Sequence, residues 1–199
     1  MWAARHGARH VIELVTRTAD LSGGDILFLV SCSEIVDAKM RSRYKHSLVL
    51  HGSDLPEGRG WSPVVWQVIE GRTTITVSLL DAADQVDSGD IWAKTTFELS
   101  GNELADEINE KLFDAELELM DYAVSNIGLI RPYAQDAARA SYYRKRSPED
   151  SRINPERSIA EQFDLMRVAD PERFPSHFDY RGCRYILRLE KATQGGEKS

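Results

Sequence analysis

The sequence has few cysteines and no grouping of metal-binding side chains. Cys32 and Cys183 stand alone, without a CxxC motif or a nearby Cys/His cluster. Disulfide frameworks and structural zinc sites both need such groupings. We therefore expect reduced thiols, no zinc site and no other bound metal ion.

The sequence also lacks long apolar runs and an excess of positive charge. No apolar stretch reaches the ~18 residues that a membrane-spanning helix needs, and the start of the chain has no signal-peptide pattern. With 25 Lys and Arg against 32 Asp and Glu, the net charge is −7, whereas nucleic-acid binding needs a concentrated basic surface. We expect a cytoplasmic globular protein that partners neither a membrane nor a nucleic acid.

Two short apolar segments predict buried strands early in the chain. Residues 25–31 and 46–50 are mostly apolar, and a loop with a short helix is expected between them at 33–44. A helical crossover between two buried strands predicts parallel pairing. His51 follows the second strand, at the carboxyl edge where ligands of open α/β sheets bind.

The following segments predict an antiparallel strand pair and helices. Residues 73–80 are rich in β-branched side chains, and residues 91–99 alternate between apolar and polar, as strands do. A short helix is expected over 63–69, and a long one over 102–127, where apolar residues recur at helical spacing. These elements together favour an α/β fold.

Beyond residue 130 the composition becomes more polar. Residues 135–155 predict a loop, residues 158–168 a helix with a capping box, and residues 178–189 a β-hairpin. We divide the chain into a main domain (1–130), a C-terminal extension of loop, helix and hairpin (131–192) and a flexible tail (193–199).

Two titratable residues are expected at the same edge of the sheet. His51 ends one strand, and Asp87 lies in the turn after a later strand. A histidine that a carboxylate orients serves as general acid or base near neutral pH. A single histidine beside a turn is also commonly an ordinary polar side chain with satisfied hydrogen bonds. The residues alone leave both interpretations open.

One continuous stretch, residues 51–90, carries a motif with several independent parts. In order, these are His51, Ser53, Leu55-Pro56, Arg59-Gly60, Pro63, Trp66, Gly71 and Asp87-Ser88-Gly89-Asp90. The pattern resembles the central region of formyltransferases that use 10-formyltetrahydrofolate, and it matches without a gap. The resemblance implies a Rossmann-like, mostly parallel sheet flanked by helices, with residues 1–130 as the catalytic domain.

The resemblance also implies roles for individual residues. His51 would act as general acid/base and polarise the formyl carbonyl, while Asp87 would orient His51 and shuttle a proton. The co-substrate 10-formyltetrahydrofolate would be contacted by Ser33, Ile35, Val36, Ala83, Asp84 and Val86. The acceptor would be contacted by Ser53, Arg59, Gly60, Trp61, Arg144 and Arg146.

The chain departs from the family pattern at two places. The family has an asparagine two residues before the histidine, which donates to the oxyanion, whereas this chain has Val49. Loss of one such donor can cost ~10²–10³ in rate, so Ser47, Ser53 or a backbone N–H is expected to replace it. The chain also starts late, so we expect either a truncated start or a missing first strand, covered by the partner in a homodimer.

The expected acceptor is the amine of a nucleotide-linked amino-deoxy sugar. Residues 53–63, 141–155 and 160–175 resemble sugar N-formyltransferases, which serve surface-glycan or flagellin glycosylation. The basic residues 142–146 suit an anionic diphosphate, or form a solvated loop. The alternatives are a methionyl-tRNA or other small-amine formyltransferase, a catalytically silent folate- or nucleotide-binding module, which Val49 favours, and a transferase that uses Cys32.

Overall fold

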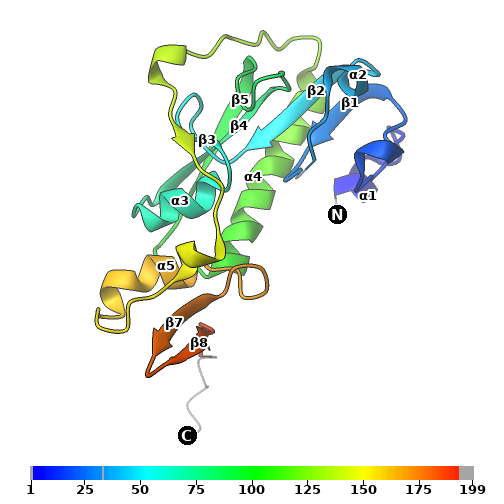
Figure 1. The fold of residues 1–199 in the computed structure, drawn as a ribbon. Helices are drawn as coiled ribbons and strands as arrows, with labels where there is room; N and C mark the ends of the chain where they lie inside the picture. Colours follow the sequence, from blue (N-terminus) through cyan, green and yellow to red (C-terminus); the bar gives the residue numbers. More distant parts are fainter. Residues whose placement is uncertain (1, 33, 193–199) are drawn as a thin grey trace, which may run out of the picture.

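A four-stranded sheet forms the centre of the molecule. The computed structural model describes residues 2–32 and 34–192, so the predicted contact at Ser33 and the predicted tail 193–199 lie outside the described residues. The strands are β1 (Gly24–Leu29), β2 (Tyr44–His51), β4 (Thr74–Asp81) and β5 (Ile91–Glu98). They lie in the order β1-β2-β4-β5, with helices on either side, which confirms the α/β class (Figure 1).

The strands pair in both senses. β1 and β2 are parallel, with Ile26 opposite His46, and α2 (Ala38–Arg41) lies in the connection between them. This confirms the predicted crossover. β2 and β4 are antiparallel, as are β4 and β5, and the second pair confirms the predicted antiparallel edge. Parallel geometry within the described sheet is therefore confined to β1 and β2.

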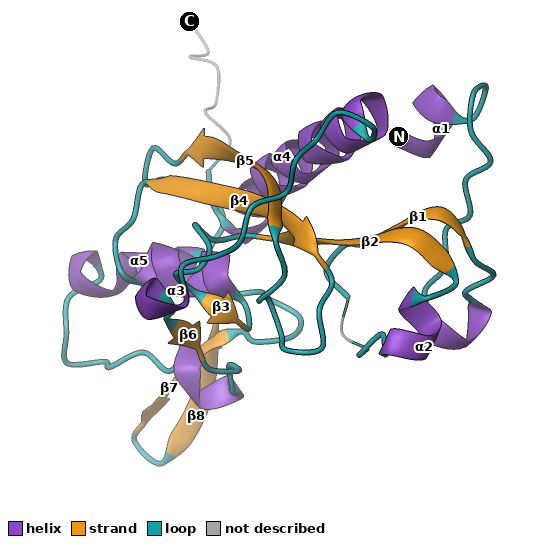
Figure 2. Cartoon of the chain, turned by 90° about the horizontal axis from the view of Figure 1, so that it is seen from above, coloured by secondary structure: helices purple, strands orange, loops and turns teal. Residues whose placement is uncertain are grey.

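The long helix α4 (Ala105–Asn126) covers one face of the sheet (Figure 2). Its buried residue Leu119 packs in one cluster with Leu48 and Leu50 of β2. Because successive residues of a strand point to opposite faces, Val49 and His51 project from the other face of β2. The candidate catalytic histidine thus lies on the side of the sheet that α4 does not cover.

Shorter elements complete the fold around the sheet. α3 (Pro63–Ile69) packs Val64 and Val68 against Ile75 of β4. The two-residue strands β3 (Arg59–Gly60) and β6 (Tyr142–Tyr143) pair in parallel, although β6 falls in a segment that the sequence predicts to be loop. The described part of the chain begins with the short helix α1 (Trp2–His6).

The C-terminal extension contains the predicted helix and hairpin. A 3-10 turn at Ala160–Gln162 leads into α5 (Phe163–Arg167), within the predicted helical range. β7 (Ser176–Tyr180) and β8 (Cys183–Leu187) form the antiparallel hairpin. No helix in the described part of the chain is long and apolar enough to span a bilayer.

Candidate active site

His51 is the last residue of β2, and two loops enclose its side chain. It is 7% exposed. Its Nε2 lies 2.8 Å from the carbonyl oxygen of Gly58, and its Nδ1 lies 3.5 Å from Oδ2 of Asp87. Because a carbonyl oxygen only accepts hydrogen bonds, Nε2 carries a proton in this arrangement. The imidazole is therefore held between oxygen atoms of two separate loops.

Asp87 lies in the loop between β4 and β5, with a positive φ of 54°. Its Oδ2 accepts a hydrogen bond of 2.9 Å from the backbone nitrogen of Gly60. Its 3.5 Å separation from His51 is longer than a hydrogen bond, and catalytic contacts of this kind commonly tighten once substrates bind. The structure thus brings the two predicted catalytic residues together.

Gln135, which was not predicted as a site residue, forms hydrogen bonds to both of the loops that enclose His51. Its Nε2 donates to the carbonyl oxygens of Asp87 and Gly89, at 2.9 and 2.7 Å. Its Oε1 accepts from Nη2 of Arg59 at 2.7 Å. Nothing in the polar sequence around Gln135 distinguishes it, because its partners lie far away in the chain.

The C-terminal extension forms a wall beside the active-site loop. Ser141 accepts from the backbone nitrogen of Gly58 through Oγ, at 2.8 Å, and from that of Arg59 through its carbonyl, at 2.9 Å. The backbone nitrogen of Trp61 donates to the carbonyl of Tyr143 at 3.2 Å. Residues on both sides of the predicted boundary at 130 therefore build one site.

Two glycines allow this close approach of backbone segments. A Cβ at Gly60, where φ is +99°, would lie 2.4 Å from the carbonyl oxygen of Tyr143. A Cβ at Gly89 would lie 1.9 Å from the carbonyl oxygen of Asp81. Since no side chain fits at either distance, the chain needs glycine at both positions.

Val49 lies on the same face of β2 as His51, in an apolar setting. It packs against the cluster of Leu55, Leu80 and Ile91 and offers no hydrogen-bond donor. Of the candidate replacements, Ser47 is half-buried, with its Oγ 3.4 Å from the carbonyl oxygen of Arg41.

Ser53, the other candidate side chain, is 2% exposed. Its Oγ has no hydrogen-bond partner within the described residues. The hydroxyl is therefore sealed from solvent in this conformation, and Ser53 would reach a substrate only after a local rearrangement.

The two segments expected to hold the folate lie side by side. Arg41 joins them, because its Nη1 donates to the carbonyl of Val36 at 2.7 Å and its Nη2 pairs with the carboxylate of Asp84. Val36 itself is buried in a small apolar cluster. Ile35 and Val86 are 84% and 54% exposed, so both leave apolar surface open around this junction.

Ala83, also expected at the folate, is exposed in the same loop as Asp84. Five of the six predicted folate contacts can thus be placed, and only Ser33 lies outside the described residues.

The residues predicted for the acceptor separate into open and enclosed positions. Trp61 is 42% exposed, and the ammonium of Lys145 lies 4.9 Å from its ring centre. Arg59 is 4% exposed and is bonded to Gln135 and to the hydroxyl of Tyr142. Trp61 is therefore open to solvent, whereas the guanidinium of Arg59 is engaged in hydrogen bonds within the protein.

Arg144 and Arg146 differ in the same way. The side chain of Arg144 is exposed but paired with the carboxylate of Asp150. Arg146 is 7% exposed, donates to Oγ of Ser151 at 2.9 Å, and burial lowers its pKa. The guanidinium of Arg146 thus lies inside the extension and not on its surface.

A comparison with protein-family models gives a match over much of the chain. The model described as Formyl transferase matches residues 7–124, which is more than half of the 199 residues. The chain belongs to the formyl transferase family. The matched region includes His51, Asp87 and most of α4, and it ends before Gln135.

Solved structures with the same fold come from several members of this family and from larger proteins. Methionyl-tRNA formyltransferase from Clostridium thermocellum is 23% identical with a TM-score of 0.71, over 85% of this chain and 74% of that one. A sugar N-formyltransferase from a Shewanella species is 15% identical with a TM-score of 0.68, over 85% and 70%. HypX from Aquifex aeolicus, in complex with tetrahydrofolic acid, is 19% identical with a TM-score of 0.72, over 83% and 29%. At these identities the likeness shows the fold alone.

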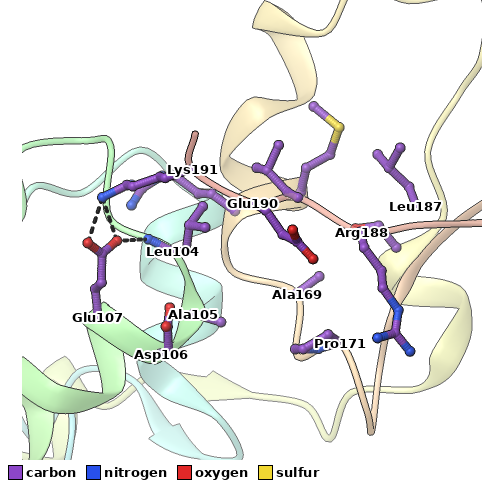
Figure 3. Close-up of a pocket in the computed structure, with 14 residues that line it drawn as sticks. Leu104, Ala105, Asp106, Glu107, Ala169, Pro171, Leu187, Arg188, Glu190 and Lys191 are labelled. Atoms are coloured by element: carbon purple, nitrogen blue, oxygen red, sulfur yellow. Dashed lines mark hydrogen bonds and ion pairs between the residues drawn. The ribbon is translucent and has the colours of Figure 1, made fainter. Parts of the chain in front are cut away.

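A separate cavity of about 470 Å³ lies between the start of α4, α5 and the end of the hairpin (Figure 3). Its wall includes Leu104, Ala169 and Leu187, and charged side chains of both signs. Lys191 bonds to Glu107 at one end, at 2.5 and 2.7 Å. None of the residues predicted for catalysis, folate or acceptor lines it.

Proposed function

We propose that this family member transfers the formyl group of 10-formyltetrahydrofolate to the primary amine of a nucleotide-linked amino-deoxy sugar. The observation that carries the proposal is the buried pair of His51 and Asp87, with 3.5 Å between Nδ1 and Oδ2, in a chain of the formyl transferase family. A buried acid–base pair at the carboxyl edge of a strand is suited to proton transfer during acyl exchange.

The reaction requires two proton movements. The acceptor nitrogen attacks the formyl carbon and loses a proton, and the carbon–nitrogen bond to the folate breaks as the folate nitrogen gains one. His51 carries the proton at Nε2 once this nitrogen has left the carbonyl of Gly58 and the ring holds its own proton at Nδ1, beside Asp87. Nε2 then accepts the proton of the acceptor amine and returns it to the folate nitrogen. Asp87, beside Nδ1, stabilises the positive charge that the ring holds between the two transfers.

The folate is assigned to the junction that Arg41 spans. Ile35, Ala83 and Val86 give apolar, exposed surface there, and backbone groups of both loops are available to a pterin ring. A tetrahydrofolate complex of the HypX structure, which has the same fold, supports the choice of folate as donor.

The acceptor is assigned to the side of the site that carries Trp61. Its exposed ring can stack on a base or sugar, and Lys145 beside it supplies positive charge for a diphosphate. The net charge of −7 favours a sugar nucleotide over a tRNA, whereas the likeness in fold extends to a sugar N-formyltransferase and to a methionyl-tRNA formyltransferase and is compatible with either acceptor. Because Arg59 and Arg146 are buried, we assign them a structural role in which they hold the loops through hydrogen bonds.

A second candidate function is a folate- or nucleotide-binding module without turnover. The observation that favours it is Val49, which places apolar surface where the family's oxyanion donor is expected. The two candidates differ in one measurable property, since the enzyme releases tetrahydrofolate from the donor whereas the module binds its ligand without turnover.

The deciding experiment incubates the purified protein with 10-formyltetrahydrofolate and a panel of UDP-, dTDP- and GDP-linked amino-deoxy sugars. Release of tetrahydrofolate together with a formylated sugar is expected with at least one member. Folate binding without release across the panel would support the module instead. Light scattering on the same sample tests the expected homodimer.

A further inference from the structure

Gln135 uses its whole hydrogen-bonding capacity at the active site. Its Nε2 donates to the carbonyls of Asp87 and Gly89, and its Oε1 accepts from Nε and Nη2 of Arg59, at 3.2 and 2.7 Å. A side-chain amide has two N–H donors and one oxygen with two lone pairs. All four are engaged, two on each of the loops that enclose His51.

These contacts close a ring around the candidate catalytic carboxylate. The backbone nitrogen of Gly60 holds Oδ2 of Asp87, Arg59 precedes Gly60 in the chain, and Gln135 connects Arg59 to the backbone of Asp87. The side chain and the main chain of Asp87 are thus fixed to the same loop by independent bonds.

Asp87 needs such support because of its backbone conformation. Its φ is +54°, and non-glycine residues held in this region persist where their surroundings fix them. Without the bonds to Gln135, the loop is free to relax and to carry the carboxylate away from the imidazole of His51.

We propose that Gln135 is a positioning residue for formyl transfer, holding the carboxylate of Asp87 beside His51 without contacting either substrate. The inference rests on the proposed function. A displacement of about 1 Å at a catalytic group can cost ~10²-fold in rate. Gln135→Leu is therefore expected to lower kcat by ~10²-fold while the KM for the folate donor changes little.

Gln135→Glu distinguishes the acceptor contact with Arg59 from the donor contacts with Asp87 and Gly89. The glutamate keeps an acceptor for Arg59, but it places a carboxylate against the carbonyls of Asp87 and Gly89. We expect it to lose kcat as Gln135→Leu does, and to retain a cooperative melting transition.

Gln162→Leu is the matched control. Gln162 is another glutamine of the extension, buried where Gln135 is half-buried, and it bonds both the backbone nitrogen and the carbonyl of Asn154, at 2.7 and 3.0 Å. It lies among residues of the extension that contact neither His51 nor Asp87. Its loss is expected to lower the melting temperature and leave kcat per folded molecule unchanged.

Two readouts separate this inference from the proposed function. If the wild type turns over and both Gln135 variants keep its kcat per folded molecule, the positioning role is wrong. If the wild type shows no turnover with any acceptor, the proposed function fails, and crystal structures of the Gln135 variants decide the positioning role. Displacement of Oδ2 of Asp87 from the backbone nitrogen of Gly60 supports it, and an unmoved carboxylate overturns it.

Discussion

Oδ2 of Asp87 lies 3.5 Å from Nδ1 of His51, with each side chain 8% exposed. The two residues are 36 positions apart and come from the ends of β2 and β4, which pair antiparallel. Their proximity depends on the β4–β5 loop folding back over the end of β2. Both side chains are therefore largely shielded from water.

His51→Ala is expected to lower kcat by ~10²–10⁴-fold, which is the usual contribution of a general acid/base. Folate binding, measured by titration calorimetry, should persist. The control is His46→Gln, since His46 lies on the opposite face of β2 against Trp92 and should leave kcat unchanged. Wild-type turnover in folded His51→Ala protein would show that the imidazole is not the acid/base.

Val49→Asn is expected to raise kcat by about tenfold or more, because it supplies an amide donor where oxyanion donors contribute ~10²–10³ in rate. The same change puts a polar group against Leu55 and Leu80, at a cost of about 1–3 kcal/mol in the free energy of unfolding. Val49→Leu, similar in shape but without a donor, should keep the wild-type kcat. An unchanged kcat in folded Val49→Asn protein would mean that another group already binds the oxyanion.

Gly89→Ala is expected to destabilise the protein and to reduce activity together. The new methyl group would lie 1.9 Å from the carbonyl oxygen of Asp81, so the loop must move and take Asp87 with it. Melting temperature and kcat are the measurements. Gly128→Ala, where the methyl group meets no atom within 4 Å, should change neither, and equal behaviour of the two variants would contradict the close approach.

Glu116 predicts a dependence of stability on pH. It is 3% exposed in α4, its Oε2 lacks a partner among the described residues, and burial raises its pKa to about 7 from 4.5. A carboxyl whose pKa is raised on folding favours the folded state while protonated. The free energy of unfolding should therefore fall as the pH rises from about 4.5 to about 7, and level off above that.

Glu116→Gln removes this dependence. At pH 8 the variant should exceed the wild type in free energy of unfolding by about 3 kcal/mol, and at pH 4 the two should be close. Denaturant titration at several pH values gives the comparison. Glu110→Gln, at an exposed position of the same helix, should follow the wild-type curve, and a parallel shift of the Glu116 variant at all pH values would point to packing instead.

The elements with local patterns were predictable from sequence. The strands β1, β2, β4 and β5 have apolar or alternating runs, and α4 has helical spacing, so each follows from residues close together in the chain. The meeting of His51 and Asp87 was predicted, but for a reason that the sheet does not support. Because β2 and β4 pair antiparallel, their carboxyl ends point to opposite edges of the sheet, and it is the β4–β5 loop that brings Asp87 back to His51.

The contacts that depend on distant partners were not predictable. Arg59 was expected to contact the acceptor, yet it bonds to Gln135, which lies 76 residues further along. β6 is only two residues long and is a strand because β3 lies beside it. In each case the role depends on a contact with a segment that is distant in the chain. The local sequence pattern does not indicate which segment that is.

The pairing of β3 with β6 has a consequence for the order in which the site is completed. The residues of the four sheet strands and of α4 have all been synthesised by Asn126. Gln135 and the Ser141–Tyr143 segment are synthesised later. A nascent chain that ends at residue 130 would contain His51 and Asp87 but would lack both Gln135 and the Ser141–Tyr143 segment. The reactive geometry therefore arises late in synthesis, after the sheet is complete.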